Sequence, residues 1–378
     1  MFGRVVLSLA VIVPLLGQGG LVRADDGQWE ITPESKAALA RGLDWLARNQ
    51  GPKGNWDSND LGLVSLGALA FLADGHTPGR GKYGDTVRRA LDYVLSNAKP
   101  SGLLNVADGG RDMYNHGLAT FVLGQAHGMT SDERVGPALD GALKLIVNTQ
   151  CDDGGWDYKA RRTKKGHDLS LAVMQAKALR SAVDSGFEVP PEVIELAIKS
   201  VRSHYRPDKT KGKTPKADEQ SLPGQFTYSG GGGATLAMAA CGVVCLQEFG
   251  QYDDWRIPKN MDAIAAEVRK LSPGKGTGQL PFDPYTMYYV GQAVYQRGGA
   301  EWAELYPKLR DTIVSTQVRV PKDPKVDGLW HDNRRVSGKP GDLYATSVGC
   351  FMLAIPNRYL PILQEGKIDS LRSRFQQP

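Results

Sequence analysis

Cysteine is scarce in this chain, and its few copies form no metal-binding or disulfide pattern. Four of the 378 residues are cysteine, at Cys151, Cys241, Cys245 and Cys350, and no Cys-x-x-Cys pair occurs. Cys241 and Cys245 are one helical turn apart, which leaves half a metal site as an alternative, but no histidine lies near them in the sequence. Buried cysteine packs as a small apolar residue. We expect no disulfide framework, no metal and no cofactor.

Long apolar runs are also missing after the first residues of the chain. The later charge-free segments are about a dozen residues long, whereas a membrane-spanning helix needs about 20. The beginning has Arg4, an apolar stretch over residues 5–16 and small residues up to Ala24. This pattern is typical of a secretory signal peptide over residues 1–24, with an uncleaved anchor as the alternative. The sequence predicts an exported protein, periplasmic or extracellular, without a stable membrane span.

No charge of one sign dominates, since the formal net charge is only +5. Basic residues gather at 159–165, which includes Arg161 and Arg162, and at 199–216. Such clusters are commonly solvated loops, but a basic rim would attract an anionic ligand such as an acidic glycan. No nucleic-acid-binding motif accompanies the charge, so nucleic acid is not an expected partner.

One pattern recurs along the chain: a glycine followed two residues later by a bulky apolar residue. The six copies pair Gly54 with Trp56, Gly102 with Leu104, Gly154 with Trp156, Gly224 with Phe226, Gly278 with Leu280 and Gly328 with Trp330. Self-similarity at intervals of some 50 residues is typical of repeat architectures.

Two kinds of helix flank each glycine. The upstream segments are charged and amphipathic, at residues 34–49, 85–97, 136–149, 191–204, 261–271 and 303–316. The downstream segments carry no charge at 61–72, 114–128, 234–246, 284–296 and 343–355, whereas 169–182 contains Lys177 and Arg180. A helix that is apolar all round is buried on all sides.

Charged helices outside neutral helices predict two concentric rings, that is, an all-α (α/α)6 toroid of six helix pairs. A solenoid of stacked helix pairs is the alternative, but its repeats are usually shorter and more even in length. No linker divides the chain, so residues 25–363 are predicted to form one domain, followed by a polar tail over residues 364–378.

Three of the copies also contain a glutamine before the tryptophan: Gln50 with Trp56, Gln150 with Trp156, and the more widely spaced Gln317 with Trp330. These segments resemble the Gln-Trp repeats of squalene and oxidosqualene cyclases, whose superfamily includes the protein prenyltransferase β subunits. The resemblance covers nearly the whole domain. It implies an α/α toroid that binds an isoprenoid or another apolar ligand in its central cavity.

The catalytic signatures of that superfamily are absent. The chain has no Asp-x-Asp-Asp tetrad, which supplies the acid of the cyclases, and no Asp-x-Cys of the prenyltransferase zinc site. The Cys-Gly-Glu-Gln thioester of related toroids is missing as well. No catalytic residue is therefore carried over from the resemblance, and the chain resembles a divergent member of that superfamily.

Aspartate opens five of the six neutral segments, at Asp60, Asp112, Asp168, Asp283 and Asp342. Asp is a favoured helix N-cap, which explains the pattern without any chemistry. In a toroid, however, these carboxylates converge at one mouth, where repulsion could raise a pKa and create a proton donor. The candidate catalytic residues are Asp112, His116, Asp168, Asp283 and Asp342. Among them Asp112 with His116 is the best pair, although His116 could instead be a core histidine.

Tyrosines are concentrated in the last three repeats, and Tyr285, Tyr289 and Tyr344 are candidate ligand-binding residues together with Arg161 and Arg162. Aromatic rings on inner helices usually pack in the core, but they can also line a cavity and face a carbocation or a sugar ring.

Three functions stay open at this point. The first is an exported, terpenoid cyclase-like protein that binds an isoprenoid or other apolar ligand, with catalysis undecided. The second is a polysaccharide lyase or hydrolase that acts on an acidic glycan. The third is a non-catalytic binding or scaffold toroid. An apolar chamber, an open polar trough and a filled axis would distinguish them in this order.

Overall fold

The computed structural model describes residues 29–207, 220, 222–229, 233–274, 276–332 and 341–364. The predicted signal peptide and all of the predicted tail except Gln364 lie outside the described residues, so export stays a prediction. Within the described ranges the chain forms twelve α-helices and only two short strands. The predicted all-α class is confirmed.

Alternate helices form a closed inner ring. In this ring each helix contacts the next, and the last contacts the first. The ring consists of α2 (Leu61–Ala73), α4 (Asp112–His127), α6 (Leu169–Asp184), α8 (Leu236–Glu248), α10 (Pro284–Arg297) and α12 (Gly341–Ala354). Every residue of α2 is buried, as expected for a helix without a polar face.

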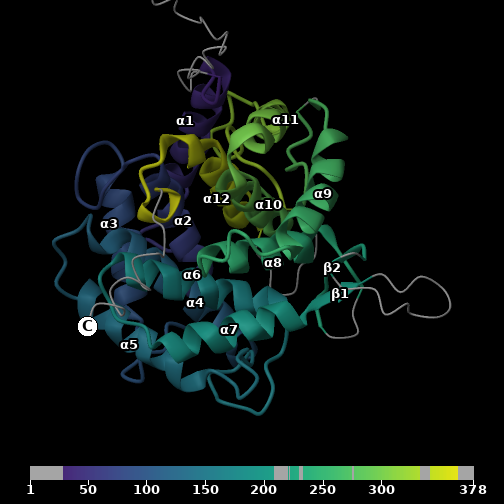
Figure 1. The fold of residues 1–378 in the computed structure, drawn as a ribbon. Coiled ribbons are helices and arrows are strands. Elements are labelled where there is room, and N and C mark those ends of the chain that lie inside the picture. The colour runs from purple at the N-terminus through teal and green to yellow at the C-terminus, as the bar shows by residue number, and fades with distance from the viewer. Residues whose placement is uncertain are drawn as a thin grey trace, which may run out of the picture.

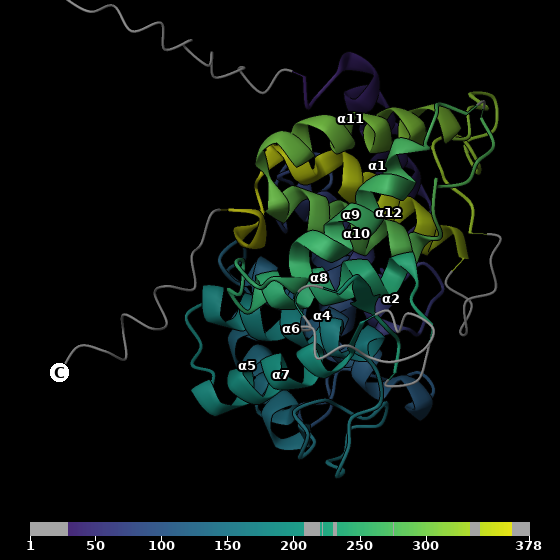
Figure 2. The ribbon, with the colours of Figure 1, turned by 45° about the vertical axis from the view of Figure 1, so that its right-hand side comes forward.

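The remaining helices lie outside this ring and bury one face each. They are α1 (Pro33–Arg48), α3 (Gly84–Ser96), α5 (Val135–Thr149), α7 (Pro191–Ser203), α9 (Arg256–Arg269) and α11 (Gly299–Thr316). In α3, for example, Val87, Leu91 and Val94 are buried, and Arg88 on the other face is exposed. In Figure 2 the helices α4 to α7 lie below α8 to α11.

In the three motifs that contain both residues, the glutamine and the tryptophan connect consecutive outer helices. Gln50 Nε2 donates to the Thr86 carbonyl of α3 at 2.7 Å and to the Gly54 carbonyl at 3.2 Å. Trp56 Nε1 donates to the Leu46 carbonyl of α1 at 2.8 Å. The motif thus satisfies carbonyls on the outer helix before it and on the outer helix after it.

Close packing explains why a glycine begins the motif. Gly54 has a φ of +79°, and a Cβ at this position would lie 2.5 Å from the Arg89 carbonyl oxygen of α3. A positive φ and a backbone contact of this kind both require the smallest residue.

The last motif closes the ring onto the first helix. Gln317 Nε2 donates to the Ala38 carbonyl of α1 and to the Gly328 carbonyl, both at 2.8 Å. Gly328 itself packs against the Arg41 carbonyl of α1. Figure 1 shows the result: α1 at the N-terminus lies next to α11 and α12 near the other end of the chain.

The sequence reading did not predict a small antiparallel pair of strands. Strand β1 (Tyr205–Pro207) pairs with β2 (Gly224–Phe226), with Tyr205 opposite Phe226. The pair extends the connection between α7 and α8 and packs on α8 and α9. Figure 1 shows it at the edge of the molecule. Three short 3-10 helices, Gly109–Arg111 (η1), Ile355–Asn357 (η3) and Pro361–Leu363 (η4), complete the described structure.

Candidate functional site

A cavity of about 820 Å³, here called the inner chamber, lies where the inner helices begin. All six inner helices or their N-caps contribute to its wall. The lining residues are Asp60, Leu63, Gly110, Arg111, Tyr114, Asn115, Leu118, Tyr158, Ser170, Met174, Tyr228, Thr235, Leu236, Ala237, Met238, Phe282, Asp283, Tyr285, Thr286 and Tyr344. Apolar side chains and six aromatic rings dominate this set, and the volume is within the usual range for a small-molecule site.

The floor of the inner chamber is made by Met174 of α6 and the tyrosines of α10. Tyr289 is fully buried and its hydroxyl donates to the Met174 sulfur at 3.0 Å. Tyr285, one turn nearer the mouth, stacks edge-on against Tyr289 with ring centroids 4.9 Å apart.

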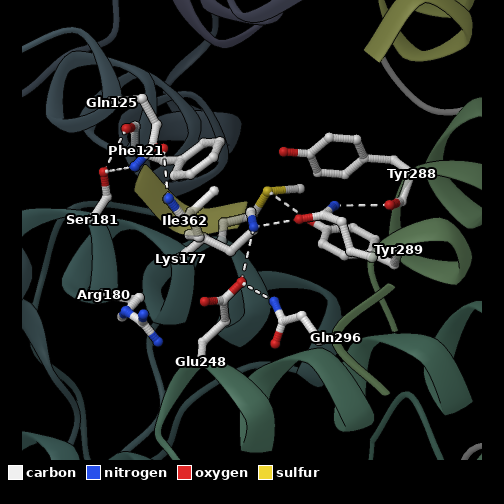
Figure 3. A network of polar contacts seen from close by, with 12 residues as sticks. Phe121, Gln125, Lys177, Arg180, Ser181, Glu248, Tyr288, Tyr289, Gln296 and Ile362 are labelled. Atoms are coloured by element: carbon white, nitrogen blue, oxygen red, sulfur yellow. Dashed lines mark hydrogen bonds and ion pairs between the residues drawn. The ribbon is translucent and has the colours of Figure 1, made fainter. Parts of the chain in front are cut away.

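Below this floor a buried ion pair fills the axis. Lys177 Nζ lies 2.9 Å from Glu248 Oε1, with 1% of each side chain exposed. The same ammonium donates to Gln292 and lies 4.5 Å from the centre of the Phe121 ring. Figure 3 shows Lys177 and Glu248 facing each other within this network. Burial lowers the pKa of Lys177, and the adjacent Glu248 offsets part of this shift.

A second cavity of about 900 Å³, the outer chamber, adjoins the first and shares Asp60, Leu63, Gly110 and Arg111 with it. Its wall is more polar. The remaining lining residues are Trp45, Asn49, Trp56, Asp57, Ser58, Asn59, Ala107, Asp108, Gly341, Asp342 and Leu343. Trp56 and Asp57 both have a positive φ, of 52° and 56°, and such strained backbone often accompanies a functional site.

Asp60 lies where the two chambers meet. It caps α2 by accepting the Leu63 N–H at 3.0 Å, and only 8% of the residue is exposed. Arg111 lies 3.3 Å from its other oxygen. Burial raises the pKa of Asp60 despite the opposing effects of the Leu63 N–H and Arg111.

Asp60 also contacts the side-chain amide of Asn115, which in turn contacts Asn105. Asn105 Oδ1 accepts the Ala107 N–H at 2.9 Å and its Nδ2 donates to Asp112 at 2.8 Å, which fixes the orientation of this amide. In one orientation of its amide, Asn115 Nδ2 donates to Asn105 Oδ1 at 2.8 Å and its oxygen faces Asp60. In the opposite orientation, Asn115 Nδ2 donates to the Asp60 carboxylate.

Two acceptors cannot face each other without a proton between them. The Asn115 atom that faces Asp60 lies 3.2 Å from Asp60 Oδ2 and closer still to Oδ1. Turning the Asn115 amide around would bring its oxygen against the oxygen of Asn105. The first orientation requires a neutral Asp60, whereas the second suits an ionised Asp60 that also pairs with Arg111.

Asp112 and His116, the best pair from the sequence, are not brought to the wall of the inner chamber. Asp112 is the first residue of α4 and accepts from Asn105 and, at 3.4 Å, from the Ala160 N–H. His116 is fully buried: Nδ1 accepts the Leu104 N–H and Nε2 contacts the Ala142 carbonyl, both at 3.1 Å. Burial lowers the pKa of His116 to about 4.

Asp168 is the N-cap of α6 and is buried behind the wall of the inner chamber. Its Oδ1 accepts from the Leu171 N–H at 3.1 Å and from the Ser170 hydroxyl at 2.5 Å. Its Oδ2 accepts from Tyr158 and lies 2.9 Å from His167 Nδ1. Because Ser170 and Tyr158 line the inner chamber, Asp168 is one hydrogen bond away from it.

Asp283 and Asp342 lie at different places on the mouth. Asp283 lines the inner chamber and caps α10 through the Thr286 N–H at 3.1 Å and the Thr286 hydroxyl at 2.6 Å. Asp342 is the second residue of α12, lines the outer chamber and lies 3.1 Å from His331 Nδ1.

The structure separates the five predicted ligand-binding residues. Tyr285 and Tyr344 line the inner chamber, and Tyr289 lies below them in the floor. Arg161 and Arg162 are exposed on the loop before α6, where they pair with Asp157 at 3.0 Å and with Asp152 at 2.9 Å. Neither arginine lines a chamber.

The sequence reading missed the role of Asp60 and the tyrosines Tyr114 and Tyr158. Asp60 belonged to the recurring aspartates, but no sequence signal distinguished it from the other four. Its contacts with Asn115 and Arg111 arise only in the folded chain.

Metal-ligating side chains do not cluster in the part of the chain that the structure describes: no group of three or more His, Cys, Asp or Glu residues there could hold a metal ion. Among the described helices, none is both long and apolar enough to cross a membrane.

Comparison with protein-family models gives no match for this chain, and comparison with curated proteins gives none either. Solved structures do match. The apo type II terpene cyclase MstE from Scytonema is 13% identical, with a TM-score of 0.52 over 87% of this chain and 100% of that one. An Asp-to-Asn variant of MstE in complex with its substrate, geranylgeranyl dihydroxybenzoate, is 12% identical, with a TM-score of 0.50 over 86% and 98%. A protein from Actinoplanes is 14% identical, with a TM-score of 0.50 over 85% and 98%. At this identity the likeness is one of fold, and the chain has the toroid-like fold of the terpene cyclases.

Proposed function

We propose that this protein binds an isoprenoid, or an apolar molecule of similar length, in the inner chamber. The observation that carries the proposal is the chamber itself, about 820 Å³ in volume and lined by apolar side chains and six aromatic rings from all parts of the ring. The likeness in fold to MstE, solved with a geranylgeranyl compound, supports the same ligand class.

The chemistry best supported at this site is protonation of an alkene. A neutral Asp60 would transfer its proton to one carbon of a double bond, and the electron pair of that bond would form the new C–H bond. The carboxylate left behind would be stabilised by Arg111, 3.3 Å away, and by the Leu63 N–H. The ring faces of the chamber would stabilise the carbocation, and loss of another proton would complete an isomerisation or a cyclisation.

The Asp-x-Asp-Asp tetrad of the resembling cyclases is absent, so Asp60 is an acid specific to this chain. Its surroundings favour the protonated form that a general acid needs, because burial raises its pKa.

Filling the chamber tests the binding proposal. Ala237 is half-buried in the chamber wall, so Ala237→Phe places a ring in the space that the ligand would occupy. We expect retention of geranylgeraniol to fall at least about tenfold, equivalent to about 1.4 kcal/mol. The measurement is mass spectrometry of lipid that stays with the protein through gel filtration.

Ala303→Phe is the matched control, because Ala303 is exposed on the outer helix α11. It should retain as much lipid as the wild type. Equal retention by both variants would show that lipid binds elsewhere, and the proposal would be wrong.

A further inference from the structure

One part of the inner-chamber wall has an unusual polarity, which is set by the buried Asp168. Its side chain accepts from donors on both oxygens, namely the Leu171 N–H, Ser170 and Tyr158, and His167 Nδ1 lies 2.9 Å away. A carboxyl group surrounded by donors in this way is an ionised carboxylate, which only accepts. A negative charge is therefore held just behind the chamber wall.

The first chain of hydrogen bonds from Asp168 ends at Tyr228. Tyr158 gives its only hydroxyl proton to Asp168. The hydrogen bond between the Tyr158 and Tyr228 hydroxyls, 2.5 Å long, must then have Tyr228 as its donor. The Tyr228 proton points away from the chamber that this residue lines, and the remaining lone pair on its oxygen is left to accept.

The second chain ends at Tyr114 and has the same direction. Ser170 gives its proton to Asp168 Oδ1, so the hydrogen bond between Ser170 and Tyr114 has Tyr114 as its donor. Tyr285 also donates away from the chamber, to the Ser170 carbonyl at 3.1 Å. Burial, and then the charge of Asp168, raises the pKa of Tyr114, so this phenol keeps its proton.

Both chains leave hydrogen-bond acceptors, and no donors, at the Tyr114 and Tyr228 hydroxyls of the chamber wall. Hydrogen bonds that end on an ionised group are stronger than neutral ones, and consecutive bonds polarise one another. The oxygens of Tyr114 and Tyr228 therefore carry extra negative charge and offer no proton, so a ligand group that only accepts would face them without a partner.

We infer that the ligand of the inner chamber carries a hydroxyl group, which donates a hydrogen bond to Tyr228 while its apolar chain fills the chamber. The inference rests on the proposed function and specifies its ligand class: an isoprenoid alcohol or phenol rather than a hydrocarbon, ether or ketone. A ligand group that can donate to the Tyr228 oxygen gains a hydrogen bond that an ether or ketone oxygen cannot form, which discriminates between such molecules.

The test is a competition between two lipids that differ only in the donor. Protein is incubated with equimolar geranylgeraniol and its methyl ether, and both bound lipids are quantified by mass spectrometry. Loss of one hydrogen bond to a polarised acceptor predicts about a tenfold preference of the wild type for the alcohol.

Variants along the first chain sharpen the test. In Tyr158→Phe the Tyr228 hydroxyl loses its acceptor and can turn its proton toward the ligand, so the preference should fall to about twofold or less. Tyr228→Phe removes the acceptor oxygen itself and should also reduce the preference for the alcohol. Tyr228 is 39% exposed. Tyr359→Phe is the control, because Tyr359 is exposed and lines neither chamber, so it should keep the wild-type ratio.

The outcomes separate this inference from the proposed function. If wild-type protein retains both lipids equally, or if Tyr158→Phe keeps the full preference while folded by circular dichroism, the hydroxyl inference is overturned and chamber binding stands. If neither lipid is retained by the wild type, the proposed function fails, and this inference fails with it.

Discussion

At the scale of single residues, the aspartates that cap the inner helices have different surroundings although they occupy equivalent positions. Asp60 contacts the Asn115 amide and Arg111, whereas Asp168 is surrounded by hydrogen-bond donors. Asp283 accepts from Thr286 at the edge of the inner chamber. Capping is thus common to them, and the second contact of each carboxyl group determines what it can do.

Asp60→Asn tests the proposed acid. Asparagine is also a good N-cap, so α2 should keep its end while the transferable proton is lost. After incubation with geranylgeraniol in D2O, we expect deuterium uptake into the lipid to fall about 100-fold or more, as for loss of a general acid. Asp283→Asn should keep the wild-type rate, and mass spectrometry of the recovered lipid measures both. Uptake that survives in Asp60→Asn would place the acid elsewhere.

His116 makes the stability of the protein depend on pH. Its pKa is about 4 in the folded chain, against 6.5 in an ordinary environment. Between pH 4 and pH 6.5, His116 is protonated in the unfolded chain but stays neutral in the folded chain. The contribution of His116 to the free energy of unfolding is fully present above pH 6.5. It is lost as the pH falls toward 4, by about 3 kcal/mol in all.

Urea unfolding at pH 7.5 and pH 4.5 checks this expectation. His116→Gln should be less stable than the wild type at pH 7.5, and the gap should shrink by about 3 kcal/mol at pH 4.5, because glutamine does not titrate. A gap that is the same at both pH values would contradict the assignment.

Sequence reasoning identified these residues but not their environments. Asp60, Asp168 and Asp283 were found because N-capping leaves a recurring pattern. Both ring nitrogens of His116 have a hydrogen-bond partner. Nδ1 accepts from the Leu104 N–H in the loop before α4, and Nε2 contacts the Ala142 carbonyl in α5. No local pattern encodes such partners.

At the scale of elements, α6 carries charged residues in its interior, whereas the charges of the other inner helices lie at their ends, and the structure explains why. Lys177 pairs with Glu248 at the end of α8, and Arg180 pairs with Asp184 at 2.8 Å. The predicted neutral segment of α8 stopped short of Glu248, so the partner of Lys177 was not recognised in the sequence. The charges occur in compensating pairs, which is how buried charge is tolerated.

This pair makes a sharp prediction. Lys177→Met leaves Glu248 buried without its partner and should lower the free energy of unfolding by about 3–5 kcal/mol. The double variant Lys177→Met with Glu248→Gln should recover much of that loss, because no buried charge remains. Urea unfolding measures both effects.

An exposed pair supplies the control. Lys270 and Glu267 are 2.6 Å apart, with 67% and 45% of their side chains exposed. Lys270→Met should change the stability by less than about 1 kcal/mol. If Lys177→Met changed the free energy of unfolding as little as Lys270→Met, the prediction that Glu248 needs its buried partner would be wrong.

At the scale of the whole molecule, one motif repeated around the ring joins neighbouring outer helices, and its last copy joins the ends of the chain. Gln317 and Gly328 contact Ala38 and Arg41 of α1. The all-α toroid could be predicted because helix charge alternates so regularly. The sequence could not reveal which part of the axis is hollow, since that depends on side chains from six helices meeting at one level.

Gly328→Ala tests the closing contact. Gly328 has a φ of +97°, and a Cβ there would lie 2.5 Å from the Arg41 carbonyl oxygen, so both strain and a clash are expected. We predict a loss of about 3 kcal/mol or more in the free energy of unfolding. Gly186→Ala has a similar φ of +88° with nothing within 4 Å of the Cβ, and should cost only about 1–2 kcal/mol. Equal losses would show that the contact with α1 contributes nothing.

Closure of the ring also determines the order in which the chain can fold. The hydrogen bond from Gln317 to Ala38 spans 279 residues, so α1 leaves the ribosome long before its partner is made. Until then Leu39, Leu43 and Leu46, which are buried in the finished ring, have no α12 to cover them. Contacts between such distant residues form slowly, because a long loop must first be ordered. The first helix to be synthesised is therefore expected to be among the last to reach its final place, and a nascent chain of this protein would depend on chaperones for most of its synthesis.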